Sequence, residues 1–350
     1  MLLRFDRQAH SALAWCVIIR RCTPPGFSMK NFIATTCAAF AAISMSTALA
    51  QTYPSKTIRM VVHFPPGGPT DLVARMVAQE LGKTWGQQVL IDNRPGAGGI
   101  VGVEMIVRAQ PDGYNLLFAT GGSMSIAPAV YAKLPYNVFN DLAPISLVVI
   151  NPQILVAHPS LPANTIKELI ALAKSKPGQI NYASVGPGSP QHLGVEYMKH
   201  MTGIDITHIP YKGSAPAMTD VMAGHVSLMF NSMPTILPLV AAKKLKAIAV
   251  SSAKRSVAAP DVPTVSEAGI PGFSYVTWYG MLAPAATAKD IIARINTEVV
   301  RIVSAKEMAD RLLREGSEPQ PGTPDQFAKF MRSEYEQWRK TAAAAKIKVD

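Results

Sequence analysis

The sequence predicts an α/β protein in which strands and helices alternate along a chain of 350 residues. Two observations support this class. Short apolar runs of strand length alternate with longer segments whose apolar residues recur at helical spacing, as in parallel β-α-β units. Glycine-bearing loops also follow four predicted strands, after Phe64, Thr120, Ser184 and Ile209. Ligands bind at the carboxyl edge of open parallel sheets, so these loops predict a ligand cleft.

Residues 1–50 have the features of an export signal. A basic start at Met29 precedes the apolar segment 32–49, and Ala48-Leu49-Ala50 before Gln51 is a cleavage site of the A-x-A type. The alternative is a transmembrane anchor, but the threonines and serines of this segment make it too weakly apolar. We therefore expect translation to start at Met29, cleavage after Ala50 and export to the periplasm.

Cysteine content and charge exclude several classes of function. Cys16, Cys22 and Cys37 all lie in the leader, so the chain from Gln51 has no disulfide, thiolate metal ligand or cysteine nucleophile. The leader carries +4 of the formal charge of +11, which leaves +7 for the rest. These basic residues are scattered without interleaved aromatics, so no nucleic-acid partner is expected. Net positive charge fits an anionic solute or an anionic membrane surface.

The predicted elements follow in order. In the first half we expect strands at 58–62, 87–91, 114–120, 145–150 and 154–158, the last two divided by Asn151-Pro152, and helices at 72–81 and 100–109. In the second half we expect strands at 180–184, 206–209, 226–230, 247–251 and 275–282. Helices are expected at 166–175 with Thr165 as its cap, 191–201, 214–224, 287–303, 306–314 and 323–345.

The connection from Phe64 to Asp71 is the most informative of the loops. Its Gly67-Gly68 turn leads from a buried strand into a helix for which Thr70 or Asp71 would be the N-cap. Unpaired N–H groups and the positive end of the helix dipole then favour an anion. An ordinary tight turn is the alternative. The spacing is not that of a dinucleotide or phosphate loop.

Catalytic and metal motifs are not found in the sequence. His192 lies near Ser184 and Ser189, so a hydrolytic pair is conceivable, but no orienting acid or oxyanion hole is identifiable. A local hydrogen-bonding role for His192 is favoured. The other histidines lack metal-ligand spacing, so neither a metal nor a cofactor is expected.

Taken together, the motifs resemble the extracytoplasmic solute receptors of tripartite tricarboxylate transporters, the Bug or TctC-like family. The matching segments extend from about Tyr53 to Val349. They are Phe64-Pro65-Pro66-Gly67-Gly68, Asn93-Arg94-Pro95-Gly96-Ala97-Gly98-Gly99, Pro111-Asp112-Gly113-Tyr114, Leu134-Pro135-Tyr136, Asn181-Tyr182-Ala183-Ser184, Gln191-His192-Leu193, Pro210-Tyr211-Lys212-Gly213-Ser214-Ala215-Pro216, Asp261-Val262-Pro263-Thr264 and Trp278-Tyr279-Gly280.

The resemblance implies a type II periplasmic binding protein fold, with two α/β lobes and a ligand cleft between them. The first lobe would be discontinuous, 51–153 plus 275–350, and the second would be 154–274. The hinges would be Asn151-Pro152 and the segment Tyr275–Thr277. Closure over the solute would be a hinge motion that the ligand's contacts in the closed state favour.

The resemblance also implies the residues of the cleft. In this family a solute carboxylate is held largely by backbone N–H groups and ordered water. The first lobe would supply Phe64, Gly67, Gly68, Thr70, Asp71, Gly122, Ser123 and Met124. The second lobe would supply Ser184, Ser189, Gln191, His192, Tyr211, Gly213, Ser214 and Asn231, and Trp278 would cover the far end.

Three positions depart from the family pattern. His63 replaces a common Pro, which we expect to have no consequence. Asn231 stands where many relatives have an Asp that could pair with an ammonium group, so amino-acid ligands are disfavoured. The segment 121–125 lacks the Asn/His pair common in the family.

The sequence therefore predicts a monomeric, non-enzymatic periplasmic receptor. It would capture an organic carboxylate and deliver it to an integral membrane permease. Engagement of a sensor protein instead of a permease is one alternative. A secreted hydrolase using Ser184 or Ser189 with His192 is another.

Overall fold

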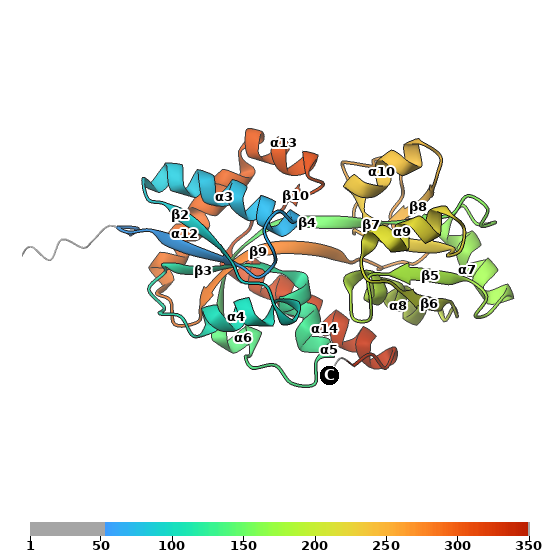
Figure 1. The fold of residues 1–350 in the computed structure, drawn as a ribbon, viewed down its shortest axis with the longest axis horizontal. Helices are drawn as coiled ribbons and strands as arrows, with labels where there is room; N and C mark the ends of the chain where they lie inside the picture. Colours follow the sequence, from blue (N-terminus) through green and yellow to red (C-terminus); the bar gives the residue numbers. More distant parts are fainter. Residues whose placement is uncertain (1–52, 349–350) are drawn as a thin grey trace, which may run out of the picture. The chain divides into compact units, whose positions relative to one another are not determined.

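The computed structural model describes residues 53–348 (Figure 1). The predicted leader, translation start and cleavage site lie outside these residues. The described part forms one compact unit in which strands and helices alternate, so the predicted α/β class is confirmed. Among residues 53–348, no helix is both long enough and apolar enough to cross a bilayer.

The strands form one mixed sheet. They are β1 (Ile58–Val62), β2 (Val89–Asn93), β3 (Asn115–Thr120), β4 (Leu142–Ala157), β5 (Asn181–Ser184), β6 (Thr207–Pro210), β7 (Leu228–Ser232), β8 (Lys246–Val250), β9 (Val276–Pro284) and β10 (Glu318–Pro319). Their order is β2-β1-β3-β9-β4-β7-β5-β6, and β8 and β10 pair with β4. The sequence predicted parallel units, and β1, β2 and β3 pair in parallel, as do β5, β6 and β7. Strands β4 and β9 pair antiparallel with each other and with their other neighbours.

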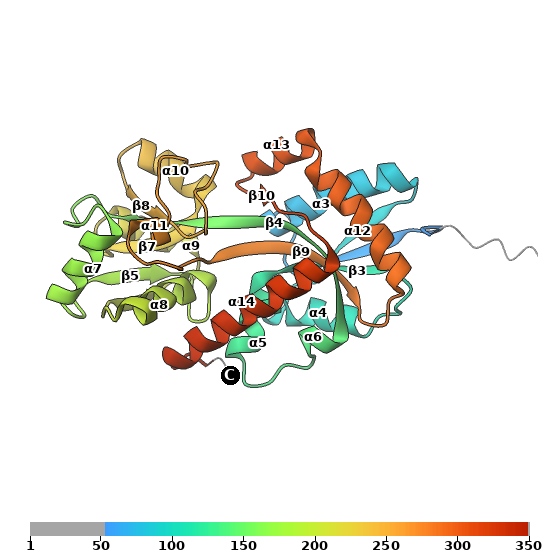
Figure 2. The ribbon, with the colours of Figure 1, turned by 180° about the vertical axis from the view of Figure 1, so that it is seen from behind.

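The helices cover both faces of this sheet (Figures 1 and 2). They are α3 (Pro69–Trp85), α4 (Ile100–Val107), α5 (Ala127–Val130), α6 (Val138–Asp141), α7 (Ile166–Ser175), α8 (Pro190–Thr202), α9 (Ser214–Met222), α10 (Met233–Ala241), α11 (Val265–Ala268), α12 (Lys289–Ser304), α13 (Lys306–Arg314) and α14 (Pro324–Ala344). Two short turns of other helix types are η2 (Ala97–Gly99) and η3 (Gly122–Ile126).

Most of the predicted helix boundaries agree with the structure. Thr165 caps α7 by accepting a hydrogen bond from the Glu168 N–H at 3.2 Å, as predicted. Helices α12, α13 and α14 begin and end within two residues of the predicted limits. Helix α10 was missed because two prolines, one of them Pro238 inside the helix, conceal its period.

Strand β4 differs from the prediction of two strands divided at Asn151-Pro152. It is continuous from Leu142 to Ala157. Up to Pro152 it pairs with β9, and from Gln153 onward it pairs with β7 and β8. A strand can pass through Pro152 because this residue lies where the pairing partner changes, so the missing N–H leaves little of the ladder unpaired.

Four apolar clusters form the core. The clusters around β1, α3 and α12, and around Trp278 and Phe327, lie on the side of β1 to β3. The other two surround β5, β7 and α10. Trp338 of α14 packs into the cluster that contains Tyr182 and Tyr275, while Phe327 of the same helix belongs to the cluster around Trp278. The C-terminal helix therefore contacts both sides of the crossing, by which we mean the paired strands β4 and β9 that connect the side of β1 to β3 with the side of β5 to β7. The limits of the two lobes remain a prediction.

Candidate functional site

The loop after β1 leads directly into α3. Gly67 has a φ of +82°, which favours glycine, and Gly68 is the N-cap without any side-chain cap. The prediction of Thr70 or Asp71 as N-cap is wrong, because α3 begins at Pro69 and both lie in its first turn. First-turn N–H groups have no acceptor within their own helix, so those of Thr70 and Asp71 are available to an anion.

The side chain of Asp71 braces this loop from within. It is 1% exposed and accepts hydrogen bonds from Gly67 N–H at 2.9 Å, Arg75 Nε at 2.8 Å and Asn93 Nδ2 at 2.9 Å. Asn93 also donates to the Phe64 carbonyl at 3.0 Å. Burial alone would raise the pKa of Asp71, but these hydrogen bonds lower it below its ordinary value. Asp71 therefore holds the loop in shape as a carboxylate.

The loop after β3 has the form of a single π-helical turn, η3. Ser123 Oγ donates to the Thr120 carbonyl at 3.0 Å and lies 3.0 Å from His63 Nε2. Met124 is fully buried in the core. The side chains of Ser123 and Met124 therefore point inward, and Gly122 is the predicted residue of this loop that is partly exposed.

His63 has a role that the sequence did not predict. Its ring is 1% exposed, joins η3 through Ser123, and lies 4.7 Å from the Phe64 ring. A Cβ added to Gly99 would come within 2.3 Å of His63 Cδ2, so α4 begins directly against this ring. Burial lowers the pKa of His63 to about 4, and the ring is neutral at pH 7. We expected His63, in place of the common Pro, to have no consequence. This is wrong as far as packing is concerned, because its ring contacts both η3 and the start of α4.

On the other side of the crossing, the loop after β5 is fastened to the start of α8. Ser189 caps α8 by accepting from the His192 N–H at 3.3 Å, and its hydroxyl donates to the Gly186 carbonyl at 2.7 Å. The Gly188 N–H donates to His192 Nδ1 at 3.1 Å. Gln191 lies in the same first turn, with a buried Oε1 that has no partner among the described residues. The predicted local role of His192 agrees with this geometry.

His192 also belongs to a stack of three rings. Its centroid lies 4.0 Å from that of His208, which lies 5.0 Å from that of Tyr182. Tyr182 OH donates to Glu196 Oε1 at 2.6 Å, and Lys199 Nζ lies 2.8 Å from the same oxygen. Burial, followed by the neighbouring His208, lowers the pKa of His192 to about 4, and burial lowers that of His208. Both imidazoles are neutral at pH 7.

The hydrolytic pairing considered from the sequence is not formed. Ser184 Oγ lies 2.6 Å from His208 Nε2, and the Ser189 hydroxyl is used in the helix cap. Among residues 53–348, no hydrogen bond joins the His192 ring to either hydroxyl. Ser184 is also 0% exposed, which keeps a substrate from its oxygen.

The loop after β6 begins α9 in the same way as the first loop begins α3. Gly213, with a φ of +115°, is an N-cap without a side-chain cap. Asn231 Nδ2 donates to Ser214 Oγ at 2.6 Å, and its Oδ1 accepts from the Ser232 N–H at 2.8 Å. Tyr211 OH donates to Asp220 at 2.5 Å. The side chains of Asn231 and Tyr211 are thus engaged in holding the start of α9.

Trp278 is a correction to the predicted site. Its side chain is 0% exposed and packs against Phe327 and Phe330, with centroid distances of 5.3 and 5.8 Å. It belongs to the core, and the ring cannot cover a solute without leaving it. Aromatic residues of this size are often core, and no sequence signal separated the two roles.

The loops from both sides point toward the middle of the described unit, where the paired strands β4 and β9 pass from one side to the other (Figure 1). What they offer chemically is backbone N–H groups at the glycine-capped starts of α3 and α9, supported by neutral hydroxyl, amide and imidazole groups. Among residues 53–348, no group of three His, Cys, Asp or Glu side chains could hold a metal ion.

Two parts joined by β4 and β9, each with glycine-bearing loops at the carboxyl ends of its parallel strands, form an architecture suited to binding a solute between them. The family model described as "Tripartite tricarboxylate transporter family receptor" matches residues 73–346, and the chain belongs to this family. This confirms the resemblance seen in the sequence.

Three relatives illustrate the similarity. BugT of Bordetella pertussis is 37% identical over 302 residues, which are 85% of this chain and 93% of BugT. The structure of R. palustris Rpa4515 with adipate has a TM-score of 0.72 and 33% identity, covering 85% of this chain and 99% of that one. MatC of Rhodopseudomonas palustris with bound malate has a TM-score of 0.67 and 32% identity, covering 83% and 99%. The two-lobe fold of this family is therefore that of the chain.

Proposed function

We propose that the chain is a periplasmic receptor that captures an organic carboxylate and delivers it to a membrane permease. The observation that carries this proposal is that α3 and α9, on opposite sides of the crossing, both begin at glycines without a side-chain cap. Backbone N–H groups left free in this way favour a carboxylate. The relatives crystallised with adipate and malate support the same class of solute.

The proposed site residues are those of the loops after β1, β3, β5 and β6. Direct contacts would come from Gly68, Thr70, Gly122, Gly213 and Ser214. Asp71, Ser123, Ser184, Ser189 and His192 would act behind them by holding the loops in place. The arrangement supports binding without chemical change, because the buried Ser184 and the cap residue Ser189 are poor nucleophiles here.

A substitution at Gly68 tests the proposal. Gly68 has ordinary extended dihedrals, φ −79° and ψ 167°, and a Cβ added there would meet only the Pro65 carbonyl at 3.8 Å. In Gly68→Asp, the new carboxylate would cap α3 and occupy the N–H groups that a solute needs, while adding only about 0.3 kcal/mol of stability. Calorimetric titration with adipate, malate and citrate should give binding to the wild type and none to the variant.

The matched control is Ala288→Asp, because Ala288 is the exposed N-cap of α12 and also lacks a side-chain cap. It should gain about 1 kcal/mol of stability, because Ala is a poorer N-cap than Gly, and it should keep its affinity for carboxylates. If no carboxylate binds the wild type, or if Gly68→Asp binds as well as the control, the proposed site is wrong.

The permease and the periplasmic location are tested separately. Exported protein should begin at Gln51, which N-terminal sequencing of a periplasmic fraction measures. Pull-down from membranes with and without the carboxylate separates delivery to a many-span permease from engagement of a sensor. Recovery of a sensor alone would contradict the transport part of the proposal.

A further inference from the structure

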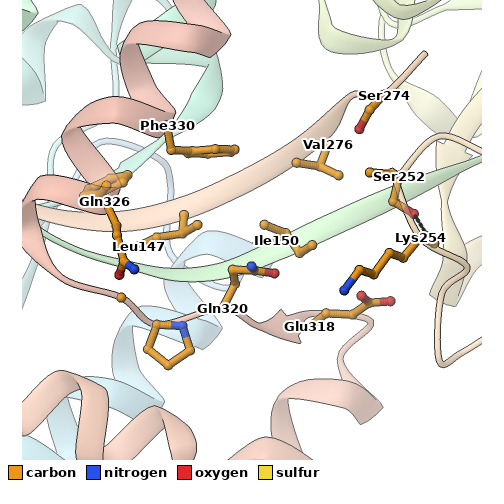
Figure 3. Close-up of a pocket in the computed structure, with 14 residues that line it drawn as sticks. Leu147, Ile150, Ser252, Lys254, Ser274, Val276, Glu318, Gln320, Gln326 and Phe330 are labelled. Atoms are coloured by element: carbon orange, nitrogen blue, oxygen red, sulfur yellow. Dashed lines mark hydrogen bonds between the residues drawn. The ribbon is translucent and has the colours of Figure 1, made fainter. Parts of the chain in front are cut away.

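A cavity of about 490 Å³ lies beside the crossing strands β4 and β9 (Figure 3). Its walls come from these two strands, the turn 252–254, the segment 318–322 and the first half of α14. None of the residues proposed to hold the carboxylate lines it. Helix α14, which supplies one wall of the cavity, lies toward the viewer in Figure 2 and behind the sheet in Figure 1. The cavity volume is within the range of small-molecule sites, which favour such junctions.

One end of the cavity carries a charge of each sign. Lys254 and Glu318 lie at this end together with Ser252 (Figure 3). Arg255, next to Lys254, is paired with Glu267 at 2.9 Å, whereas Lys254 enters no ion pair among residues 53–348. Glu318 Oε1 accepts from Ser256 Oγ, and its other oxygen has no hydrogen bond among the described residues. A cation and a carboxylate are thus both available to an occupant.

The other end is mainly apolar, with the Gln326 amide beside the apolar side chains (Figure 3). Leu147 and Phe330 lie there, and Ile150 and Val276 line the middle (Figure 3). These side chains form the outer surface of the core cluster around Trp278 and Phe327. Phe330 is partly exposed on the cavity side, so an apolar group placed against it would remove apolar surface from water.

We propose that this cavity is a second small-molecule site, which takes a zwitterionic amino acid with an apolar side chain. The ligand's carboxylate would bind Lys254, its ammonium group would bind the free oxygen of Glu318, and its side chain would lie against Leu147 and Phe330. A simple carboxylate or amine would leave one of the two protein charges unmatched. This ligand class differs from that of the carboxylate site, where Asn231 offers no charge to an ammonium group.

An occupant would contact both sides of the crossing. Lys254 follows β8, on the side of β5 to β7, whereas Phe330 and Glu318 belong to segments that follow β9. Binding would therefore favour one angle between the two sides. By linkage, it would change carboxylate affinity by the same factor as the carboxylate changes amino-acid affinity. This consequence, unlike the site itself, rests on the proposed function.

Calorimetry with L-leucine and L-phenylalanine tests the site, with 4-methylpentanoate and isoamylamine as probes that lack one charge each. The two amino acids should bind the wild type with one site per chain. In Gly68→Asp, where the carboxylate site is blocked, the single-charge probes should bind at least about tenfold more weakly than the amino acids, since a charged hydrogen bond is lost. Lys254→Met and Glu318→Gln should each lose about tenfold in affinity for the amino acids.

Lys329→Met is the matched control, because Lys329 is an exposed neighbour of Phe330 on α14 that does not line this cavity. It should bind the amino acids as the wild type does. Gly68→Asp should also retain this binding, which separates the two sites. No binding of either amino acid to the wild type, or equal affinities in Lys254→Met and the control, would overturn the proposal.

Discussion

The two sides of the candidate site hold their loops by different chemistry. On the side of β1, the loop is held by charge: Asp71 receives hydrogen bonds from Gly67, Arg75 and Asn93. On the side of β5, the loop is held by neutral rings, because Gly188 donates to His192, which stacks on His208. The same task, keeping backbone N–H groups in position, is performed by a carboxylate in one case and by unprotonated imidazoles in the other. The two sides should therefore respond differently to substitution, pH and salt.

The largest expected effect is on the charged side. Asp71→Ala removes the acceptor of three donors at once and leaves the partly buried Asn93 amide without this partner. We expect a loss of about 3 kcal/mol in the free energy of unfolding, together with loss of carboxylate binding. Urea denaturation and calorimetry measure the two effects. A loss below that of a typical surface substitution would show that the loop does not depend on this carboxylate.

The matching change on the ring side should cost less. His192→Phe keeps an aromatic ring against His208 but removes the acceptor of the Gly188 N–H. We expect a loss of about 1 kcal/mol, because one neutral hydrogen bond is lost and the stack remains. His192→Asn, which offers an acceptor without the ring, separates the hydrogen bond from the stacking. If the phenylalanine variant is as damaging as Asp71→Ala, the two sides do not differ as described.

As the pH is lowered, the loop after β5, which His192 holds, should lose stability before the loop after β1, which Asp71 holds. The pKa of His192 is about 4 in the folded chain, below its ordinary value of 6.5. Between these two pH values, His192 is therefore protonated to a smaller extent in the folded chain than in the unfolded chain. Stability therefore falls as pH drops from about 6.5 to about 4. A protonated Nδ1 cannot accept from Gly188. Asp71 has a lowered pKa, so it stays ionised, and keeps accepting the hydrogen bonds that hold the loop after β1, down to a lower pH.

Amide hydrogen exchange at pH 7 and pH 5, corrected for intrinsic rates, measures this difference. Protection of the Gly188 N–H should fall by more than about tenfold, because pH 5 lies below the ordinary His192 pKa of 6.5 and above its folded value, while that of Gly67 changes little. His63 also has a lowered pKa, but its ring contacts Ser123 and not Gly67. Equal loss of protection at both glycines would contradict the assignment.

The smallest effect is expected for Arg75→Gln. Arg75 is paired with Asp71 at 2.8 Å, but its side chain is 49% exposed, so water and salt screen the pair. We expect a loss of at most about 1 kcal/mol, which decreases at high salt. The corresponding measurement on His192→Phe should show no salt dependence. A salt-independent loss in Arg75→Gln would mean that packing of its side chain, not charge, is what matters.

The sequence was most informative about local structure. Strand-helix alternation, the glycine loops and the cap at Thr165 follow from spacing and residue type, and the structure has all three. The continuity of β4 was not predictable, because Asn151-Pro152 is a typical turn sequence. In the structure the strand continues through it, because the pairing partner of β4 changes there from β9 to β7 and β8. The N-cap of α3 was also misassigned, because Pro69 occupies the first helical position and Gly68, two residues before Thr70, is the cap.

The site residues were predicted less completely. His63, Asn93 and His208 hold the loops but act through contacts with residues far away in the sequence, such as His208 with Ser184 at 2.6 Å. The register of β5 with β6, which sets Tyr182 opposite His208, could have indicated this pair had the register been known. Trp278 lies in the core because α14 covers β9. Nothing in the type of this residue or its place in the sequence indicates that α14 packs against it.

The continuity of β4 has a mechanical consequence. Because β4 passes from one half of the sheet to the other without a break, and β9 pairs with it up to Pro152, the junction is a two-stranded ribbon and not a pair of loose linkers. Any reorientation of the halves must be absorbed as torsion of that ribbon. The ribbon would therefore favour one angle between the two halves, and binding of a solute that requires another angle would have to supply the free energy of twisting it.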